Sequence, residues 1–354
     1  MPSQGFDLSL WVALAVGVLI CGFFLAARSR FLSIPVLRAV APAASPPDCM
    51  VVIPARDEES LIGRAVQSFP HDSVIVVDDH SSDRTAEAAR KAGAGVLPAP
   101  DLPRGAVGKA HACLTAARVL TSKWILFADA DTFFAAGFLE SAVACADASG
   151  SALLSILADA ELVTWSEQIL YPYAQALFFA GVAPRRNPAA VFNGQCLLVR
   201  REAYEFLGGH AAVMNSLVDD VKLAGLAQRH RLKFSTVRGG RLARARFRGA
   251  GASFRRAAYR FLLLNFWAAG AVLLAALMAS LWLPAVLWLM TGHHPLGASI
   301  LAIPLMLLML PWYKNFWRTM EAPVAIYFLL PILFRAAIAA VLGQPVQWKG
   351  RMIC

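Results

Sequence analysis

The sequence predicts an α/β domain built on a mostly parallel sheet with helices on both faces, flanked in the chain by transmembrane helices. Short apolar runs of strand length alternate with helical stretches between residue 48 and about residue 250, which is typical of a parallel sheet covered by helices. Nearly all the carboxylates lie in that zone. Of the 354 residues, 58% are apolar and only 16% are charged, a composition closer to a membrane protein than to a soluble domain.

The N-terminal zone, residues 1–46, is predicted to be a transmembrane anchor followed by a linker. Its apolar run, 8–27, is too long for the core of a signal peptide, and no basic segment precedes it. Three arginines follow the run instead: Arg28, Arg30 and Arg38. By the positive-inside rule, they predict that the next domain, residues 47–250, faces the cytoplasm.

The C-terminal zone, residues 251–354, is predicted to be an interfacial and transmembrane region. It contains three apolar segments, 261–290, 296–312 and 325–342. The first is long enough for one tilted span. Pro331 and Arg335 interrupt the third, and a third full crossing would leave Lys349 and Arg351 outside, against the positive-inside rule. The last segment is therefore either re-entrant or interfacial, or an exception to that rule.

The net charge of +10 points to an anionic partner. Eight arginines lie between residues 238 and 260, interleaved with Phe247, Phe254 and Tyr259, directly before the apolar run. This arrangement predicts an interfacial helix on anionic lipid. Arginines with aromatics also suit single-stranded RNA, but the adjacent membrane segment disfavours that alternative. We therefore expect the membrane bilayer as a partner and no nucleic acid.

Each element of the α/β zone follows from its residues. Met50–Pro54, Ser73–Val77 and Lys123–Phe127 are short runs rich in β-branched or aromatic residues, which indicates buried strands. The stretches between them have the length and mixed polarity of helices, and Ser82 or Asp83 offers an N-cap for one of them. The predicted helices are 58–69, 83–92, 109–120 and 218–230.

Carboxylates follow three of the predicted strands. They are Asp57, then Asp78 and Asp79, then Asp129 and Asp131. In open α/β sheets ligands bind outside the carboxyl ends of the strands, so these residues predict a polar site at that edge. The spacing of Asp129 and Asp131 suits a hard divalent cation that shares its ligands with substrate phosphates. The alternative for this pair is a solvated loop after a strand.

The sequence disfavours three kinds of site. Neither the dinucleotide-binding motif G-x-G-x-x-G nor the P-loop motif G-x-x-x-x-G-K-[ST] occurs, and the six cysteines form no C-x-x-C pair of the kind that binds zinc.

Two helix starts leave alternatives open. Lys109 opens a predicted helix, where an ammonium and backbone N–H groups favour a diphosphate, although it is equally a surface lysine. Asp219 and Asp220 open another helix, either because the helix dipole favours acids there or because one of them is a general base.

Together these residues resemble the family 2 inverting glycosyltransferases, which have the GT-A fold. The matching segments occur in the family's order between about 47 and 247: Val51–Glu58, Val76–Asp83, Gly108–Ala112, Ala128–Asp131, Asn193–Gln195, Gly208–His210 and Asp219–Asp220. The flanking membrane segments, with Arg200–Tyr204 and Trp348–Arg351, resemble a membrane-anchored branch that includes carotenoid and hopanoid-associated glycosyltransferases. The resemblance implies a GT-A-type sheet and a catalytic role for residues 47–250.

The resemblance also implies the roles of the donor-side residues. Pro54, Asp57 and Asp79 are expected to line the base and ribose of a nucleotide sugar. Lys109 and Asp129 are expected to hold its ribose and diphosphate.

Other residues are implied for the metal, the chemistry and the acceptor. The resemblance makes Asp131 the ligand of a divalent cation, Mg²⁺ or Mn²⁺, and Asp220 the catalytic base. Asp219 stands where the family usually has Glu, so the base assignment stays open between the two acids. The residues implied on the acceptor side are Asn193, Gly194 and Gln195.

The activity implied is an inverting, metal-dependent transfer of a sugar from a nucleotide sugar to a hydroxyl of a membrane lipid, either a terpenoid or a glycolipid. A multi-pass protein of the inner (cytoplasmic) membrane is expected. The Q-x-x-R-W motif of processive synthases is missing, and Arg244–Phe247 is only a distant stand-in, which disfavours polymer synthesis. Two alternatives stay open: a polyprenyl-phosphate sugar synthase, and a catalytically silent membrane scaffold of the same fold.

Overall fold

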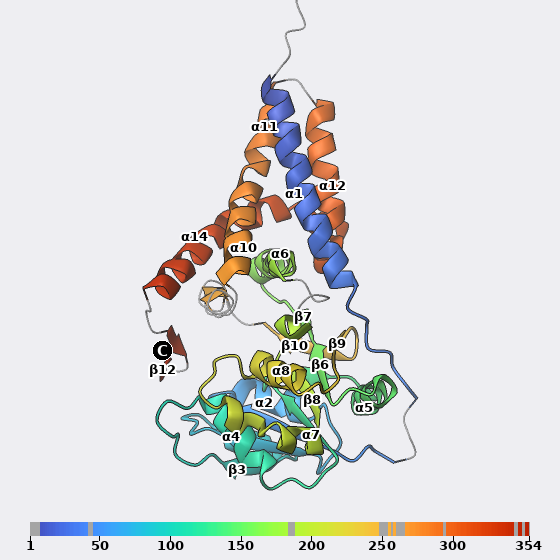
Figure 1. Ribbon diagram of the computed structural model, residues 1–354, viewed down its shortest axis with the longest axis vertical. Helices are drawn as coiled ribbons and strands as arrows, with labels where there is room; N and C mark the ends of the chain where they lie inside the picture. Colours follow the sequence, from blue (N-terminus) through green and yellow to red (C-terminus); the bar gives the residue numbers. More distant parts are fainter. Residues whose placement is uncertain are drawn as a thin grey trace, which may run out of the picture. The chain divides into compact units, whose positions relative to one another are not determined.

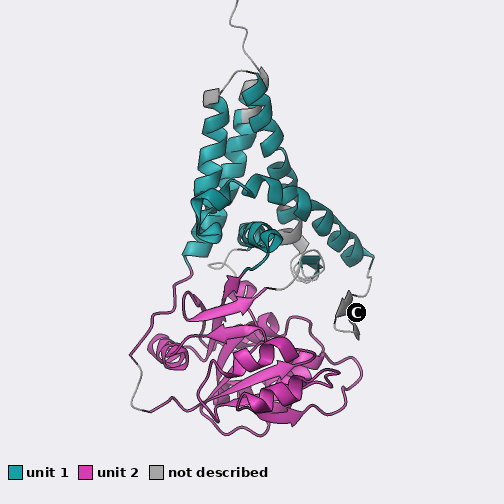
Figure 2. Cartoon of the chain, turned by 180° about the vertical axis from the view of Figure 1, so that it is seen from behind, with its two compact units in different colours: residues 1–33, 162–183, 248–354 teal, residues 34–161, 184–247 magenta. Residues whose placement is uncertain are grey.

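The computed structural model describes residues 8–41, 45–182, 188–247, 254–255, 258–259, 266–292, 295–342, 346–348 and 351–353. The chain forms two compact units (Figure 2). The sheet unit comprises residues 34–161 and 184–247, and the apolar unit comprises 1–33, 162–183 and 248–354. The division into domains at residues 46 and 250 stays a prediction. In the structure, the 162–183 segment packs with the apolar helices.

The main sheet of the sheet unit has seven strands within the described residues, in the order β3-β2-β1-β4-β8-β6-β9 (Figure 1). The strands are β1 (Cys49–Ala55), β2 (Val74–Asp78), β3 (Gly95–Pro98), β4 (Trp124–Ala128), β6 (Leu153–Leu157), β8 (Cys196–Arg200) and β9 (Phe234–Arg238). All neighbouring pairs are parallel except those of β8, which runs antiparallel to β4 and β6. The predicted mostly parallel sheet is confirmed. A smaller sheet pairs β10 (Ala243–Arg246) with β5 (Thr132–Phe134) and β7 (Asp159–Glu161).

Helices cover both faces of the main sheet, because successive side chains of a strand point to opposite faces. Val51 and Ile53 of β1 pack in one core with α2 (Glu59–Val66), α3 (Thr85–Lys91) and α5 (Phe138–Ser149). Val52 packs in a second core with α4 (Gly108–Ala117), α7 (Arg201–Phe206) and α8 (Asp219–Arg229). Both faces are therefore buried, which explains why the strands read as unbroken apolar runs rather than as alternating patterns.

The strand order places a topological switch point between β1 and β4. The chain leaves β1 towards β2 and β3, and then returns to the other side of β1 with β4. The antiparallel β8 brings its first residue, Cys196, opposite Ala128, the last residue of β4. The segment just before β8 is thereby carried to the carboxyl end of β4, where the Asp129 N–H donates to the Gln195 carbonyl at 3.0 Å. This edge of the sheet is where a ligand site is expected.

The apolar unit consists mainly of helices. They are α1 (Leu8–Leu32), α6 (Trp165–Gly181), α10 (Phe266–Ser280), α11 (Trp282–Thr291), α12 (Pro295–Tyr313), α13 (Phe316–Thr319) and α14 (Ala322–Val341). Three stretches in the described part of the chain are long and apolar enough to cross a membrane: 14–32, 272–291 and 322–341. The unit also contains a hairpin of β11 (Val346–Trp348) and β12 (Arg351–Ile353).

The predicted span within 261–290 agrees with the candidate span 272–291, in which α10 ends at Ser280 and α11 begins at Trp282. One expectation for the apolar helices needs correction. Pro331 does not interrupt the third segment, since it lies inside the continuous helix α14. Helices in apolar surroundings tolerate such prolines.

Helix α6 packs against α1, α10, α12 and α14. It begins with a capping box in which Thr164 and Glu167 satisfy each other's backbone N–H groups. Its Tyr173 ring meets Phe24 of α1 edge-on at 5.6 Å. The Tyr313 hydroxyl of α12 donates to the Ile169 carbonyl at 2.8 Å. Most of the arginine-rich segment after residue 247 lies outside the described residues.

The core of the sheet unit gives a first testable expectation. Leu126 of β4 is 0% exposed, between two neighbouring strands and under the helices of one face. We expect Leu126→Ala to destabilise the protein by about 2–5 kcal/mol, since a buried leucine leaves a cavity. Its thermal midpoint in detergent should fall by several degrees, whereas Val119→Ala, at a residue 61% exposed, should leave it nearly unchanged. Equal midpoints for the two variants would contradict the assigned core.

Candidate active site

Lys109 lies at the centre of the polar cluster at this edge of the sheet. It is the second residue of α4. Its Nζ lies 2.6 Å from Asp129 Oδ1 and donates to the Gly194 carbonyl at 2.9 Å. Burial disfavours its charge, but the carboxylates of Asp129 and Asp219 outweigh burial and hold the pKa of Lys109 above its usual value. The side chain as a whole is 25% exposed, so the lysine is not closed off from solvent.

Asp219 and Asp220 form the first turn of α8. Both oxygens of Asp220 accept backbone hydrogen bonds, Oδ2 from the Gly194 N–H at 2.5 Å and Oδ1 from the Val221 N–H at 2.7 Å. Burial and the neighbouring Asp219 carboxylate raise the pKa of Asp220 to about 6, with Lys109 and the two N–H groups opposing the rise. Asp220 is therefore ionised at neutral pH and more basic than an ordinary aspartate, as a general base must be.

Gly194 links the lysine to the acid, because its carbonyl accepts from Lys109 while its N–H donates to Asp220. A Cβ there would lie 3.2 Å from both Asp220 Oδ2 and Lys109 Nζ, so only glycine fits without displacing them. Its neighbours fix the turn: the Gln195 N–H donates to Asn193 Oδ1 at 2.9 Å, and the Asn193 N–H donates to Ser155 Oγ at the same distance. The structure thus brings the predicted acceptor-side segment together with Lys109 and the acid pair.

A second polar cluster lies at the ends of β1 and β2. Asp57 Oδ1 accepts from the Ser82 N–H at 2.7 Å, and Arg56 Nη1 lies 4.0 Å from Asp79 Oδ2. Asp57 and His80 have positive φ angles of 51° and 56°. Such conformations cost energy in non-glycine residues and persist only where surrounding contacts enforce them, often at functional sites. The predicted donor-side residues Asp57 and Asp79 are therefore joined through one arginine.

Pro54 and Asp131 occupy the expected strand ends. Pro54 lies in β1 and pairs in register with Val77 of β2. Asp131 is half-buried between β4 and β5, and its carbonyl accepts from the Arg246 N–H at 2.8 Å. Among the described residues, no three His, Cys, Asp or Glu side chains gather as a ligand set. One or two carboxylates completed by phosphate oxygens is the usual way in which proteins hold Mg²⁺, so the donor set here fits such a cation only together with a phosphorylated ligand.

Two residues of the polar clusters, Arg56 and His210, have no predicted role. Arg56 lies within 4.0 Å of both Asp57 and Asp79, the two acids predicted on the donor side. His210 is 2% exposed, and its Nε2 lies 3.6 Å from Asp219 Oδ2. Both belong to segments already quoted for the family resemblance, so the missing information was their contacts rather than their position.

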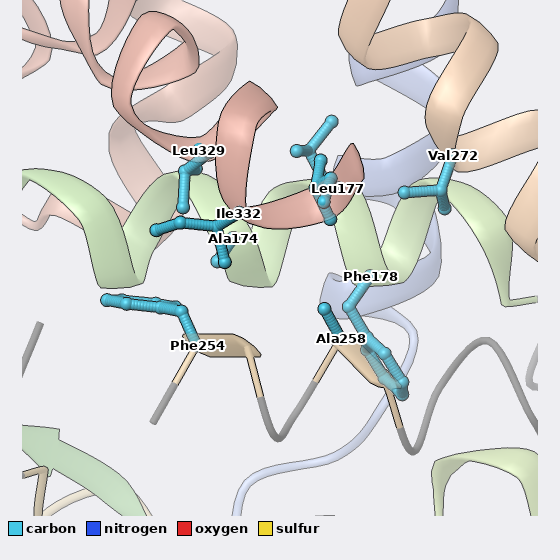
Figure 3. Close-up of a pocket in the computed structure, with 9 residues that line it drawn as sticks. Ala174, Leu177, Phe178, Phe254, Ala258, Val272, Leu329 and Ile332 are labelled. Carbon is cyan, nitrogen blue, oxygen red and sulfur yellow. The ribbon is translucent and has the colours of Figure 1, made fainter. Parts of the chain in front are cut away.

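The apolar unit holds a cavity of about 120 Å³. Its lining is wholly apolar and comes from α6, α10, α14 and residues 254 and 258 (Figure 3). Ala174 and Phe178 contribute from α6, and Leu329 and Ile332 from α14, close to Pro331. The cavity offers dispersion contacts and no hydrogen bonds from side chains, so it suits only a hydrocarbon group.

Comparison with known proteins finds a family model that matches much of the sheet unit. Residues 50–208 match the model of the glycosyl transferase family 2. The 4,4'-diaponeurosporenoate glycosyltransferase of Staphylococcus haemolyticus is 40% identical over 87 residues, which make up 23% of this chain and 23% of that protein. The Staphylococcus aureus protein of the same name is 39% identical over 89 residues, 24% of each chain. The matched stretch is thus less than a quarter of either relative.

A solved structure resembles nearly the whole chain. It is a mannosyltransferase from Pyrobaculum calidifontis in complex with GDP-Man and Mn²⁺, with a TM-score of 0.53 over 95% of this chain and 100% of that one. At 22% identity the likeness shows a shared fold. The predicted GT-A-type architecture is confirmed.

Charge compensation by Lys109 can be tested through stability. We expect Lys109→Met to cost about 1–3 kcal/mol at pH 7.5, because it leaves the carboxylates around it without their counter-charge. An aspartate whose pKa is raised in the folded state, as that of Asp220 is, binds its proton more tightly when folded and stabilises the fold at low pH. Loss of the Lys109 ammonium raises the pKa of Asp220 further. The loss of stability in Lys109→Met should therefore become smaller as the pH falls from 7.5 to 5.

Thermal unfolding at the two pH values measures this effect. The control is Lys123→Met, at an exposed lysine, which should show no pH-dependent deficit. A Lys109→Met deficit that is constant or grows towards pH 5 would contradict the arrangement.

Proposed function

We propose, from the match of residues 50–208 to the glycosyl transferase family 2, that the chain transfers a sugar from a nucleotide sugar to a hydroxyl of a membrane lipid, with inversion at the anomeric carbon and with a divalent cation. One observation carries the proposal. A lysine at a helix start and an acid with raised basicity are held by the same glycine, Gly194. Such a pair can bind a leaving diphosphate and activate an attacking hydroxyl in one place.

On the donor side, Lys109 is proposed to bind the diphosphate. Its ammonium and the free N–H groups of the first turn of α4 suit a diphosphate. Asp129 would turn to the ribose as the diphosphate takes over its ammonium partner. The cluster of Arg56, Asp57 and Asp79 at the ends of β1 and β2 offers hydrogen bonds for the base and ribose, with Pro54 beside them.

On the reacting side, Asp220 is proposed to take the proton of the acceptor hydroxyl. The hydroxyl oxygen then forms its bond to the anomeric carbon while the bond from that carbon to the diphosphate oxygen breaks on the opposite face. One displacement of this kind inverts the configuration and needs no covalent sugar–enzyme intermediate. Asp131 would hold a divalent cation, which when bound neutralises charge on the leaving diphosphate.

The acceptor is proposed to be a lipid because the other unit is built from apolar helices, in which three of the described stretches are long enough to span a membrane. The cavity between α6, α10 and α14 would take a hydrocarbon part of that lipid. The names of the two staphylococcal relatives, both 4,4'-diaponeurosporenoate glycosyltransferases, support a terpenoid class of acceptor but not a particular acceptor group on it. The raised basicity of Asp220 favours a hydroxyl acceptor over a polyprenyl phosphate, which is ionised already. The arginines after α1 support a cytoplasmic sheet unit at the inner membrane.

The proposed function can be tested on the full chain in detergent with a panel of nucleotide sugars, including UDP-glucose and GDP-mannose. Release of nucleoside diphosphate is measured with Mn²⁺ or Mg²⁺ and again with EDTA, and a bacterial lipid extract is then added as acceptor. We expect one donor to be consumed, faster with the lipid extract and not at all with EDTA. A folded protein that consumes none of them would contradict the proposal and support the silent scaffold.

Replacement of the proposed base separates chemistry from binding. Asp220→Asn keeps the size of the side chain but cannot accept a proton, so we expect turnover to fall by roughly 10²-fold or more while donor affinity changes little. The matched control is Asp219→Asn. A smaller loss of turnover in this variant than in Asp220→Asn would support Asp220 as the base. Near-normal turnover in Asp220→Asn would move that role to Asp219.

Replacement of the proposed cation ligand should act on binding instead. We expect Asp131→Ala to abolish the gain in nucleoside diphosphate affinity that Mn²⁺ gives the wild type, because a carboxylate ligand is lost. Titration calorimetry with and without Mn²⁺ measures that gain, and Glu87→Gln, at an exposed carboxylate of α3, serves as the control. An undiminished Mn²⁺ effect in Asp131→Ala would exclude this ligand.

A further inference from the structure

His210 lies buried next to the acid pair. It is part of a short 3-10 turn, Gly209–Val213, and its ring meets Phe127 of β4 edge-on, with centroids 4.6 Å apart. Its Nδ1 lies 2.9 Å from the Tyr204 hydroxyl, and its backbone N–H donates to the same oxygen at 3.1 Å. On the other side of the ring, Nε2 lies 3.6 Å from Asp219 Oδ2. Both ring nitrogens thus face a polar partner, although Tyr204 and His210 are only 6% and 2% exposed.

The two polar partners of the ring favour one tautomer. Nε2 faces a carboxylate oxygen, which can only accept, whereas the Tyr204 hydroxyl can donate its hydrogen to Nδ1. The proton of a neutral ring then lies on Nε2 and points at the Asp219 carboxylate. Burial lowers the pKa of His210 to about 4, with Lys109 adding to the effect and Asp219 opposing it, so the ring is neutral at pH 7.

The local sequence is built for this contact. Gly208 and Gly209 both have positive φ angles, 76° and 52°, which turn the chain sharply before His210. A Cβ on Gly209 would lie 2.4 Å from atoms of the Tyr204 ring, so the backbone approaches the ring more closely than any other residue allows.

We propose that Tyr204 and His210 form a buried hydrogen-bonding chain that orients the Asp219 carboxylate, and that His210 is thereby a positioning residue for the acid pair. This proposal rests on the proposed function, since it concerns the geometry of the proposed base. Asp219 adjoins Asp220 in the first turn of α8, and its charge acts on both Asp220 and Lys109. A fixed Asp219 keeps the base strong and the lysine charged. At 3.6 Å the contact between Nε2 and Asp219 Oδ2 is longer than a hydrogen bond, so the proposal requires that it shortens to one when substrate is bound.

Kinetics of three variants test the proposal with the nucleotide sugar that the wild type consumes. His210→Phe keeps an aromatic ring against Phe127 but has no nitrogen, and we expect kcat to fall about 10- to 100-fold with the donor KM within about threefold. His210→Gln restores a donor towards Asp219 and should recover part of the loss. Tyr204→Phe removes the partner of Nδ1, so the His210 ring can take either tautomer. Its kcat should lie between those of His210→Phe and His210→Gln.

Phe127→Leu is the matched control, because it disturbs the packing of the ring and leaves the hydrogen bonds in place. It should retain kcat within about threefold. If His210→Phe and Phe127→Leu lower the thermal midpoint alike and leave kcat alike, the histidine is a packing residue and the proposal is wrong. If the wild type consumes no nucleotide sugar, the proposed function fails, and the next measurement still decides the hydrogen-bonding chain.

That measurement needs no activity. Nitrogen-15 spectra of the full chain with labelled histidine report the tautomer of each ring, and loss of one signal in His210→Phe assigns it. We expect the Nε2–H tautomer at pH 7, with no protonation down to about pH 5, and a shift of this signal in Asp219→Asn. An Nδ1–H tautomer, or a ring protonated at pH 7, would overturn the proposal because Nε2 would no longer act as the neutral donor to Asp219.

Discussion

The ammonium of Lys109 is the charge on which the polar edge of the sheet depends. Carboxylates from two elements approach it, Asp129 after β4 and the acid pair at the start of α8, and the carbonyl of Gly194 completes its shell. Without it, buried like charges would lie together at the switch point of the sheet, where they would either take up protons or separate. One cation thus holds the acids ionised and close, and its side chain is not closed off from solvent.

The strand order explains how these groups meet. The parallel strands β1, β2 and β4 end at the same edge, while the antiparallel β8 begins there and brings Gly194 with it. Helices α4 and α8 pack on the same face of the sheet, so that their first turns lie at this edge as well. The fold therefore brings two helix N-termini, three strand ends and one tight glycine contact to the same edge of the sheet, where Lys109 and Gly194, 85 residues apart in the sequence, lie within 2.9 Å.

Much of this could be predicted from the sequence because its causes are local. Runs such as Met50–Pro54 are apolar and β-branched whatever their neighbours are, and Lys109 and Asp219 open helices by composition alone. The antiparallel β8 could not be predicted, since its direction depends on pairing with β4 and β6. The bond from Gly194 to Asp220 and the contact between His210 and Asp219 were equally hidden, because each joins residues that only the tertiary fold brings together. Pro331 misled because an apolar environment tolerates a proline that would end a helix in water.

Asp220 is proposed to be the base of a single displacement at the anomeric carbon, and the configuration of the released sugar tests this most directly. With UDP-glucose or GDP-mannose as the α-linked donor that the protein consumes, proton NMR recorded within minutes of starting the slow reaction with water reports the first anomer formed, before mutarotation mixes the two. The account predicts the β-anomer as the initial product. An initial α-anomer would mean retention, and with it a mechanism that the arrangement of Lys109, Gly194 and Asp220 does not provide.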